Sequence, residues 1–206
     1  MNSYSCKLGC ILLAGGKSRR MGRPKSELPV GKSTMLGHIL GILRPLFSII
    51  VVVRAPGDGA LPENEKAILA QDSTEGEGPL RGLEAGLFAL PRSVERVYVS
   101  GCDTPLLRPA LVELVLATFV SGQAQVPLVG GFPQPLSAAY RTNILSTVSQ
   151  MLAEGQRSLQ SMLGRIDTRW VPEEQIRHVD PNLESFENAN TPEDFQRIMN
   201  LKAMDP

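Results

Sequence analysis

The sequence has little of the chemistry that marks disulfide-rich or zinc-binding proteins. Its 206 residues include only three cysteines, two histidines and one tryptophan. Three cysteines cannot form a disulfide framework, and no histidine lies near Cys6, Cys10 or Cys102 in the chain to complete a metal site. We therefore expect these cysteines to be small buried apolar residues in a reducing compartment.

Net charge and long apolar runs are also missing. Lys and Arg together number 21, as do Asp and Glu, so the formal net charge is zero. This balance gives no electrostatic footprint for DNA, RNA or an anionic membrane, so any phosphate-binding charge must be local. No stretch approaches the roughly 20 apolar residues of a membrane span, and glycines and basic residues interrupt the first apolar run, unlike a secretory signal. A cytoplasmic protein is the simplest consequence.

What the sequence does contain is an alternation of short apolar runs and helical patterns. Runs at 8–14, 48–53 and 96–100 are typical of buried strands, and weaker candidates lie at 124–129 and 168–171. Helical spacing and N-cap signals predict helices at about 34–43, 80–90, 111–119, 143–154, 158–165 and from 191 onward. The length and the alternation predict one α/β domain over residues 1–206, with a largely parallel sheet.

The glycine-rich stretch after the first predicted strand is the most informative segment. Gly15, Gly16 and Gly22 allow the backbone to turn tightly and to bring its N–H groups close to an anion. Five cations fall between Lys17 and Lys25 in a chain without net charge. Such a loop at the carboxyl end of a strand suits a nucleoside triphosphate. The alternative is an ordinary tight turn with a solvated basic face.

Other nucleotide-binding motifs do not fit this stretch. Gly31-Lys32-Ser33 and Gly16-Lys17-Ser18 each supply the end of a Walker A motif, but the first glycine that the motif needs would fall on Ser26 or Ile11. A dinucleotide fingerprint fails because charged residues follow Gly15-Gly16. A P-loop GTPase or kinase is therefore disfavoured.

Short blocks of distinctive sequence follow one another along almost the whole chain. They are Leu13-Ala14-Gly15-Gly16 with Arg20-Met21-Gly22 and Lys25, then Gln71-Asp72, Gly78-Pro79-Leu80-Arg81-Gly82-Leu83, Cys102-Asp103-Thr104-Pro105-Leu106, Gln134-Pro135-Leu136 and Asn188-Ala189-Asn190-Thr191-Pro192-Glu193-Asp194. In this order they resemble the molybdenum cofactor guanylyltransferases and related nucleotidyltransferases. Because several blocks match in register, chance is a poor explanation of the likeness.

The resemblance implies a Rossmann-like three-layer sandwich that binds GTP and Mg²⁺. Such an enzyme transfers GMP to the terminal phosphate of molybdenum-bound molybdopterin and releases pyrophosphate. Gly15-Gly16 resembles the GTP-using branch, whereas the cytidylyltransferase relatives usually show Ala-Gly at this place. Pro24 departs from the pattern, because many guanylyltransferases place an acid immediately before the loop lysine. The resemblance also raises molybdenum-insertion proteins and molybdoenzyme chaperones as partners.

Two alternatives stay open at this point. One is a related nucleotidyltransferase that uses CTP or another nucleotide on a pterin cofactor, a sugar phosphate or a phospho-acid. The other is a non-catalytic GTP-binding module. The simultaneous presence of Lys25 and Asp103 counts against the module, since a binder has no chemical need for both.

Several loop residues match family positions that surround the nucleotide. Lys25 matches a lysine that contacts the phosphates, and Arg19 or Arg20 would neutralise the leaving pyrophosphate, because this chemistry depends on positioning and charge neutralisation. The remaining positions that the resemblance assigns to GTP binding are Leu13, Ala14, Gly15, Gly16, Asp72, Gly78 and Asp103.

Asp103 is the predicted metal ligand. It follows the strand at 96–100, and Mg²⁺ is commonly held by few protein carboxylates together with phosphate oxygens and water. Its alternative role is to accept backbone N–H bonds in a turn. Asn190 would either add an oxygen near the metal or the acceptor, or cap the last helix. Trp170 could pack beneath the pterin, but we expect it to pack in the core, which is the usual place of a single tryptophan.

Overall fold

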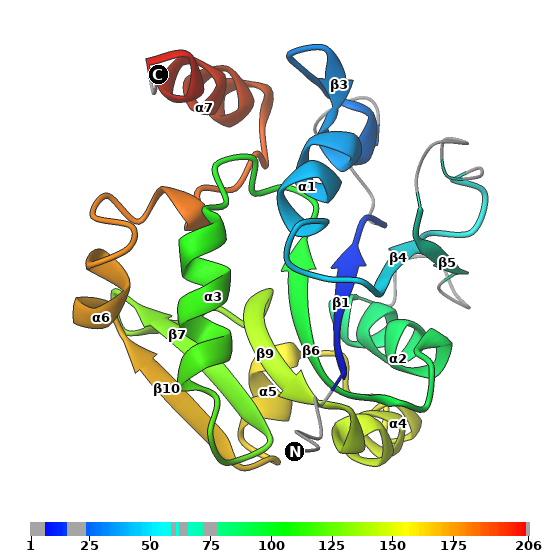
Figure 1. The fold of residues 1–206 in the computed structure, drawn as a ribbon. Helices are drawn as coiled ribbons and strands as arrows, with labels where there is room; N and C mark the ends of the chain where they lie inside the picture. Colours follow the sequence, from blue (N-terminus) through cyan, green and yellow to red (C-terminus); the bar gives the residue numbers. More distant parts are fainter. Residues whose placement is uncertain (1–6, 16–23, 59–60, 62–65, 72–77, 205–206) are drawn as a thin grey trace, which may run out of the picture.

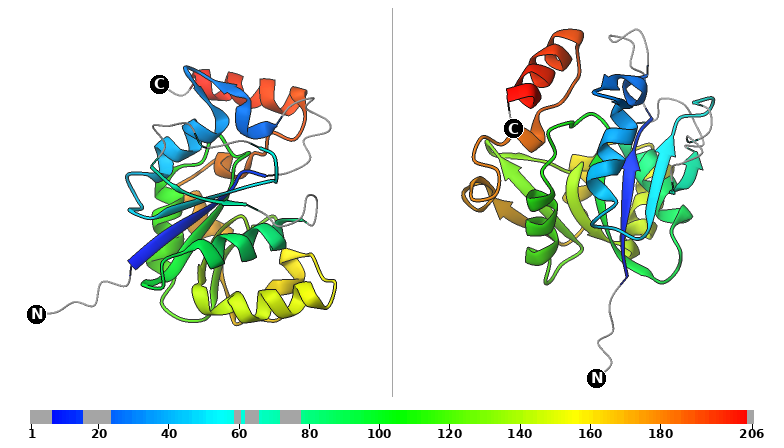
Figure 2. Two further views of the ribbon diagram at one scale, coloured as in Figure 1. Left: turned by 90° about the vertical axis from the view of Figure 1, so that its right-hand side faces the viewer. Right: turned by 45° about the horizontal axis from the view of Figure 1, so that its top comes forward.

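A central β-sheet lies between two layers of helices in the computed structural model, which describes residues 7–15, 24–58, 61, 66–71 and 78–204 (Figures 1 and 2). The strands run in the order β10-β7-β9-β6-β1-β4-β5, and β8 pairs with β7 beside this path. All neighbours on the path are parallel except those of β9, which is antiparallel to β6 and to β7. The predicted largely parallel α/β sheet is thus confirmed.

Five strands and six helices fall close to the ranges that the sequence predicts, whereas the strands at 29–30, 33–34, 68–71, 132–133 and 137–141 and the helix at 173–177 are not predicted. The strands are β1 (Lys7–Leu13), β2 (Pro29–Val30), β3 (Ser33–Thr34), β4 (Ile50–Arg54), β5 (Ile68–Gln71), β6 (Val94–Gly101), β7 (Ala124–Val129), β8 (Phe132–Pro133), β9 (Ser137–Arg141) and β10 (Thr168–Pro172). The α-helices are α1 (Met35–Leu43), α2 (Pro79–Ala89), α3 (Pro109–Thr118), α4 (Leu145–Ala153), α5 (Leu159–Leu163), α6 (Glu173–Arg177) and α7 (Pro192–Met204). Short 3₁₀ turns cover Lys25–Glu27, Thr142–Ile144 and Glu184–Phe186.

The apolar run of β1 serves both faces of the sheet, because successive side chains of a strand point to opposite sides. Cys10 and Leu12 join the core that α1 and α3 cover, and Ile11 joins the core beneath α2, α4 and α5. Figure 2 shows these two helical layers on either side of the sheet. A strand buried on both faces must be apolar throughout, which is why residues 8–14 lack alternation.

Capping residues fix where two of the helices begin. The Thr34 side chain accepts a hydrogen bond from the backbone N–H of Gly37 at the start of α1. At the start of α7, Thr191 Oγ1 accepts from the N–H of Asp194, and the Asp194 carboxylate accepts from the N–H of Thr191. Each such cap is worth about 1 kcal/mol. Both N-termini lie where the sequence places them.

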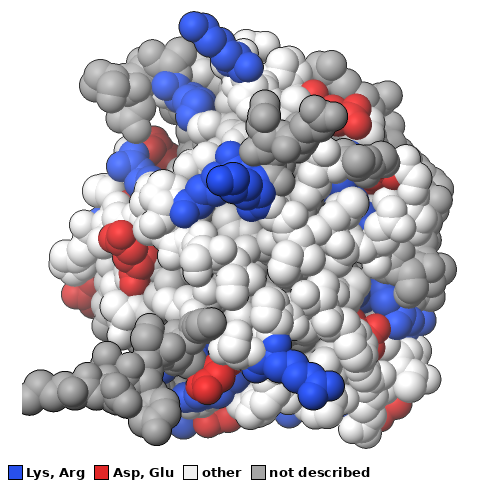
Figure 3. All heavy atoms as spheres, turned by 45° about the vertical axis from the view of Figure 1, so that its right-hand side comes forward, with Lys and Arg blue, Asp and Glu red and all other residues white. Residues whose placement is uncertain are grey.

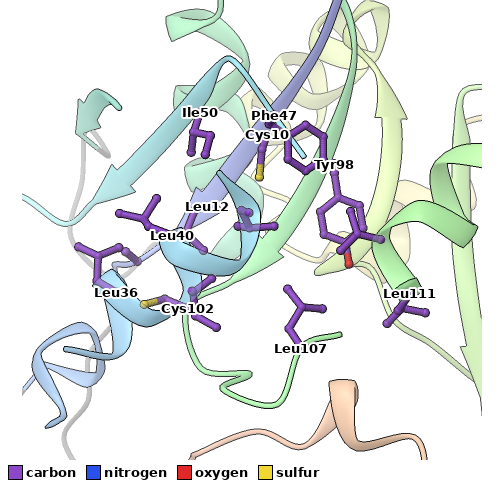
Figure 4. Close-up of a cluster of buried hydrophobic side chains, with 14 of the residues drawn as sticks. Cys10, Leu12, Leu36, Leu40, Phe47, Ile50, Tyr98, Cys102, Leu107 and Leu111 are labelled. Atoms are coloured by element: carbon purple, nitrogen blue, oxygen red, sulfur yellow. The ribbon is translucent and has the colours of Figure 1, made fainter. Parts of the chain in front are cut away.

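Cys10 and Cys102 are buried free thiols, as predicted, while Cys6 lies outside the described residues. Both belong to the core cluster drawn in Figure 4, together with Leu12, Leu40 and Tyr98. Burial raises the pKa of Cys102 to about 12 and raises that of Cys10 further. Neither thiol is therefore a nucleophile near neutral pH.

The expectation that Trp170 packs in the core is wrong. Its side chain is 45% exposed on the edge strand β10, whereas the next residue, Val171, points to the opposite face of the sheet and is buried. Within the described part of the chain, no helix is long and apolar enough to cross a membrane.

Candidate functional site

The carboxyl ends of β1, β4 and β6 meet at one edge of the sheet. The parallel register places Leu13 beside Val53 and Gly101. Just beyond the strands, the N–H of Ala14 donates to the carbonyl oxygen of Val53 at 2.8 Å, and the N–H of Cys102 donates to that of Leu13 at 3.0 Å. The predicted nucleotide loop therefore leaves the sheet next to the segment that carries Asp103.

Gly15 lies too close to the end of β4 for any side chain. A Cβ built on it would stand 2.8 Å from the backbone nitrogen of Ala55 and 3.2 Å from the carbonyl carbon of Arg54. Backbone atoms cannot rotate away, so a larger residue would force the chain to shift. Close approach, rather than an unusual backbone angle, explains the glycine.

Lys25 is brought against two oxygen atoms from distant parts of the chain. Its Nζ donates to Asp103 Oδ2 at 2.8 Å and to Asn190 Oδ1 at 2.6 Å. The Lys25 and Asp103 side chains are 21% and 25% exposed, so the pair lies in the wall of the molecule with access to solvent. The structure thus gathers three of the predicted site residues at one point.

Asn190 uses its side chain at this point and not on the last helix. Thr191 supplies the cap of α7, and the Asn190 oxygen accepts from Lys25 instead. The neighbouring backbone joins the same point, because the N–H of Ala189 donates to the carbonyl oxygen of Asp103 at 2.9 Å. Of the two roles open to Asn190 from the sequence, the geometry favours the one beside Asp103.

The oxygen atoms around the Lys25 ammonium suit a hard cation. Asp103 Oδ2 and Asn190 Oδ1 converge on one positive charge, as they would on a metal ion. Gly101 leaves room for the carboxylate, since a Cβ there would stand 2.8 Å from Asp103 Oδ1. Among the residues that the structure describes, no group of three or more His, Cys, Asp or Glu could hold a metal. Any Mg²⁺ here would take most of its ligands from substrate phosphates and water.

A cavity of 340 Å³ opens beside Asp103. Its walls come mainly from Asp103 and Thr104 after β6, from residues 134–137 around the start of β9, from residues 157–160 around the start of α5, and from Phe186 and Asn188. Its volume is that of a small-molecule site. The predicted blocks at Cys102–Leu106 and Gln134–Leu136 therefore meet around one hollow.

Two basic residues near the site carry no signal in the sequence. Arg157 lines the cavity, and its Nη1 donates to the carbonyl oxygens of Leu152 and Gln156, which fixes the guanidinium group at the wall. Arg54 is buried at the end of β4, with Glu27 Oε1 at 3.7 Å from its Nη2. Local sequence cannot reveal either position, because only tertiary packing places them at this edge.

Gly78 stands at the N-cap of α2 with a φ of +84°, and a Cβ there would lie 3.5 Å from the carbonyl oxygen of Arg157. It thus lies near the cavity wall. The other predicted nucleotide contacts, Gly16, Arg19 and Asp72, lie outside the described residues. On the face in Figure 3, Lys and Arg form small groups separated by large uncharged areas.

Comparison with known proteins supplies the family. The model of the MobA-like NTP transferase domain matches residues 10–170. The chain belongs to the MobA-like NTP transferase family. As a member of this family it is a nucleotidyltransferase, as the blocks of sequence predict.

Relatives of this MobA-like chain match it over nearly its full length. A protein of Mycobacterium avium (strain 104), described as a probable molybdenum cofactor guanylyltransferase, is 33% identical over 97% of this chain and 98% of its own. The crystal structure of molybdopterin-guanine dinucleotide biosynthesis protein A from Archaeoglobus fulgidus aligns with a TM-score of 0.82 and 26% identity, covering 95% and 99% of the two chains.

A third comparison bears on the fold of MobA-like proteins. A Mycobacterium tuberculosis H37Rv protein, solved in complex with manganese, aligns with a TM-score of 0.63 and 13% identity over 94% of this chain and 98% of its own. At this identity the likeness shows only the shared architecture. It agrees with the Rossmann-like three-layer arrangement that the sequence predicts.

Proposed function

We propose that this chain is a Mg²⁺-dependent molybdenum cofactor guanylyltransferase of the cytoplasm. It transfers GMP from GTP to the terminal phosphate of molybdenum-bound molybdopterin and releases pyrophosphate. The observation that carries the proposal is the meeting of Lys25, Asp103 and Asn190 beside the cavity. The names of the Mycobacterium avium and Archaeoglobus fulgidus relatives support the choice of nucleotide and acceptor.

In the reaction, an oxygen of the acceptor phosphate attacks the α-phosphorus of GTP. A new P–O bond forms there, and the bond from the α-phosphorus to the oxygen bridging to the β-phosphate breaks. Negative charge builds up on the equatorial oxygens and on the pyrophosphate that leaves. The protein must therefore hold the two substrates in line and neutralise this charge.

The residues at the sheet edge fit these two tasks. The Lys25 ammonium moves from Asp103 and Asn190 toward the phosphates of GTP, and Arg19 neutralises the leaving pyrophosphate. Asp103 and Asn190 would hold Mg²⁺, which when bound supplies positive charge to the phosphate oxygens. The backbone around Leu13 and Gly15 encloses the nucleotide.

The acceptor occupies the cavity next to Asp103. Arg157 offers a fixed guanidinium group for its phosphate, a recognition for which arginine is well suited. Leu136 and Phe186 offer apolar surface to a flat ring system. We place the attacking oxygen and the α-phosphorus beside Asp103, which lies in the cavity wall.

Gly15 supports the choice of GTP as the nucleotide. The cytidylyltransferase relatives usually carry alanine at this place, but here a Cβ would press on the backbone nitrogen of Ala55. The backbone of this chain therefore leaves space only for glycine at position 15, the residue that resembles the GTP-using branch.

The deciding experiment measures pyrophosphate release from GTP, CTP, ATP and UTP, with and without Mo-molybdopterin, in the presence of Mg²⁺ or of a chelator. We expect release only with GTP, acceptor and metal together, and a product with the mass of the guanylated cofactor. Release with CTP alone among the nucleotides would move the chain to the cytidylyltransferase branch. GTP binding without any release would indicate the non-catalytic module.

A further inference from the structure

One segment of the chain crosses the acceptor side of the site. We call residues 180–190, which join α6 to α7, the strap. Phe186 and Asn188 of the strap line the cavity, the N–H of Ala189 donates to the carbonyl oxygen of Asp103, and Asn190 accepts from Lys25. The position of the strap therefore sets the shape of the site.

The other end of the strap forms a turn around a buried carboxylate. The Asp180 side chain is 0% exposed. Its Oδ2 accepts from the N–H of Ser185 at 2.8 Å, and its Oδ1 accepts from the N–H of Glu184 at 3.1 Å. A buried carboxylate is retained only where donors satisfy it, so its two oxygens fix two consecutive backbone groups of the strap.

Arg108, the residue before α3, connects this turn to the sheet. Its Nε lies 3.5 Å from Asp180 Oδ1, and its Nη2 lies 2.7 Å from Glu184 Oε2. Its backbone N–H donates to Ser185 Oγ at 3.0 Å. Because Arg108 follows Asp103 by a short loop and starts a helix packed on the sheet, it gives the strap a rigid reference point.

The backbone inside the turn is held in an unfavourable conformation. Leu183 has a φ of +59°, and it is the only residue other than glycine with a positive φ in the part of the chain that the structure describes. Left-handed backbone is strained for a branched side chain and persists only where the surroundings impose it. Here the N–H of Leu183 donates to the carbonyl oxygen of Asp180, and its side chain packs on the core.

We infer that Asp180, acting through Ser185 and Glu184, is a positioning residue for the acceptor side of the active site. It imposes the left-handed turn at Leu183 and so fixes how Phe186 and Asn188 stand in the cavity wall. The assignment of that wall to the acceptor rests on the proposed function. The contact of the strap with Asp103 also predicts a smaller effect on the catalytic step.

The test is Asp180→Asn, which keeps the size of the side chain. The amide NH₂ of the new Asn side chain would face the backbone N–H of Glu184 or of Ser185, and two donors cannot form a hydrogen bond with each other. The substitution also removes the negative charge that attracts Arg108. Steady-state kinetics should show a rise of the acceptor KM of at least about tenfold, while the Kd for GTP changes by no more than about threefold. Hydrogen exchange should become faster in residues 184–190, in the absence of any substrate.

Glu187→Gln is the matched control. It removes a carboxylate of the same strap that pairs with Arg197 Nη2 at 2.6 Å on the outer surface, away from Asp180. The acceptor KM of this variant and its hydrogen exchange in residues 184–190 should equal those of the wild type. Where Asp180→Asn does not fold, Ser185→Ala removes only the hydroxyl acceptor of the Arg108 N–H and should raise the acceptor KM in the same direction.

Two results would overturn the inference. One is a folded Asp180→Asn or Ser185→Ala protein with wild-type acceptor KM and wild-type exchange in the strap. The other is a parallel loss of GTP affinity and acceptor affinity, which would indicate a general structural role. A wild-type protein that transfers no GMP would contradict the proposed function instead, and exchange in the strap would then decide the positioning role by itself.

Discussion

Replacing Lys25 with methionine separates its role in the substrate site from its role in the fold. Methionine keeps most of the length of the side chain but removes the charge that Asp103 Oδ2 and Asn190 Oδ1 contact at 2.8 and 2.6 Å. In the free protein the pair is partly exposed, so water can solvate Asp103 after the change. We therefore expect a loss of unfolding free energy of only about 1 kcal/mol.

The loss in GTP binding should be larger. One charge-assisted hydrogen bond to a phosphate is worth about 1.5–3 kcal/mol. At 1.4 kcal/mol for each factor of ten, the Kd for GTP should rise about 10- to 150-fold. Titration calorimetry at fixed ionic strength measures this rise, and thermal denaturation of the same samples measures the change in stability.

Lys32→Met is the matched control, because Lys32 is also a lysine and lies exposed in the turn between β2 and β3. It should bind GTP like the wild type. If Lys25→Met also bound GTP like the wild type, Lys25 would not contact the phosphates. If the variant lost stability while it bound GTP like the wild type, the Lys25–Asp103 pair would serve the fold alone.

Three further changes test other parts of the site. Asp103→Asn keeps an acceptor oxygen but removes the charge, so Mg²⁺-dependent turnover should fall by about 100-fold or more, while stability falls by only about 1 kcal/mol, as when Lys25→Met breaks the same ion pair; a stable, fully active variant would exclude the metal role. Gly15→Ala places a Cβ against the backbone nitrogen of Ala55, so we expect the variant to lose GTP affinity and about 1–3 kcal/mol of stability together. An unchanged Tm would refute the close approach of Gly15 to Ala55. Burial, reinforced by Lys202, lowers the pKa of His38, so the unfolded chain binds more protons and stability is lost as pH falls below about 6.5. The Tm of His38→Gln should therefore fall less steeply between about pH 7 and 5 than the wild-type Tm, and parallel curves would contradict this origin.

The sequence predicts those strands and helices whose own residues form an apolar run or a helical spacing of apolar residues. β1, β4 and β6 are buried on both faces, and continuous apolar runs reveal them. β9, with the sequence Ser-Ala-Ala-Tyr-Arg, has no β-branched residue, and it is a strand because β6 and β7 pair with it. β5 is only four residues long, and three of them are exposed at the edge of the sheet. Neither strand has a local signal that would reveal it.

The site divides in the same way. Lys25, Asp103 and Asn190 can be proposed from motifs, but their meeting spans 78 and 165 residues of sequence and depends on the whole sheet. The roles of the residues in the glycine loop stay predictions. Asp180 gives no signal at all, because in the sequence it is one of 21 acidic residues and belongs to no recognisable motif. Only its complete burial shows what it holds.

The reversed strand β9 has a consequence for how specificity can change. It separates β6, β1, β4 and β5, which carry the nucleotide loop, from β7 and β10. Since β9 runs against its neighbours, the segment at 130–136 that leads into it arrives at the same edge as the carboxyl ends of the parallel strands. That segment forms part of the cavity wall, yet it contacts neither β1 nor β4 in the sheet ladder. Insertions or exchanges there can reshape the acceptor pocket while the nucleotide half keeps its register, so one catalytic edge can be adapted to different acceptors.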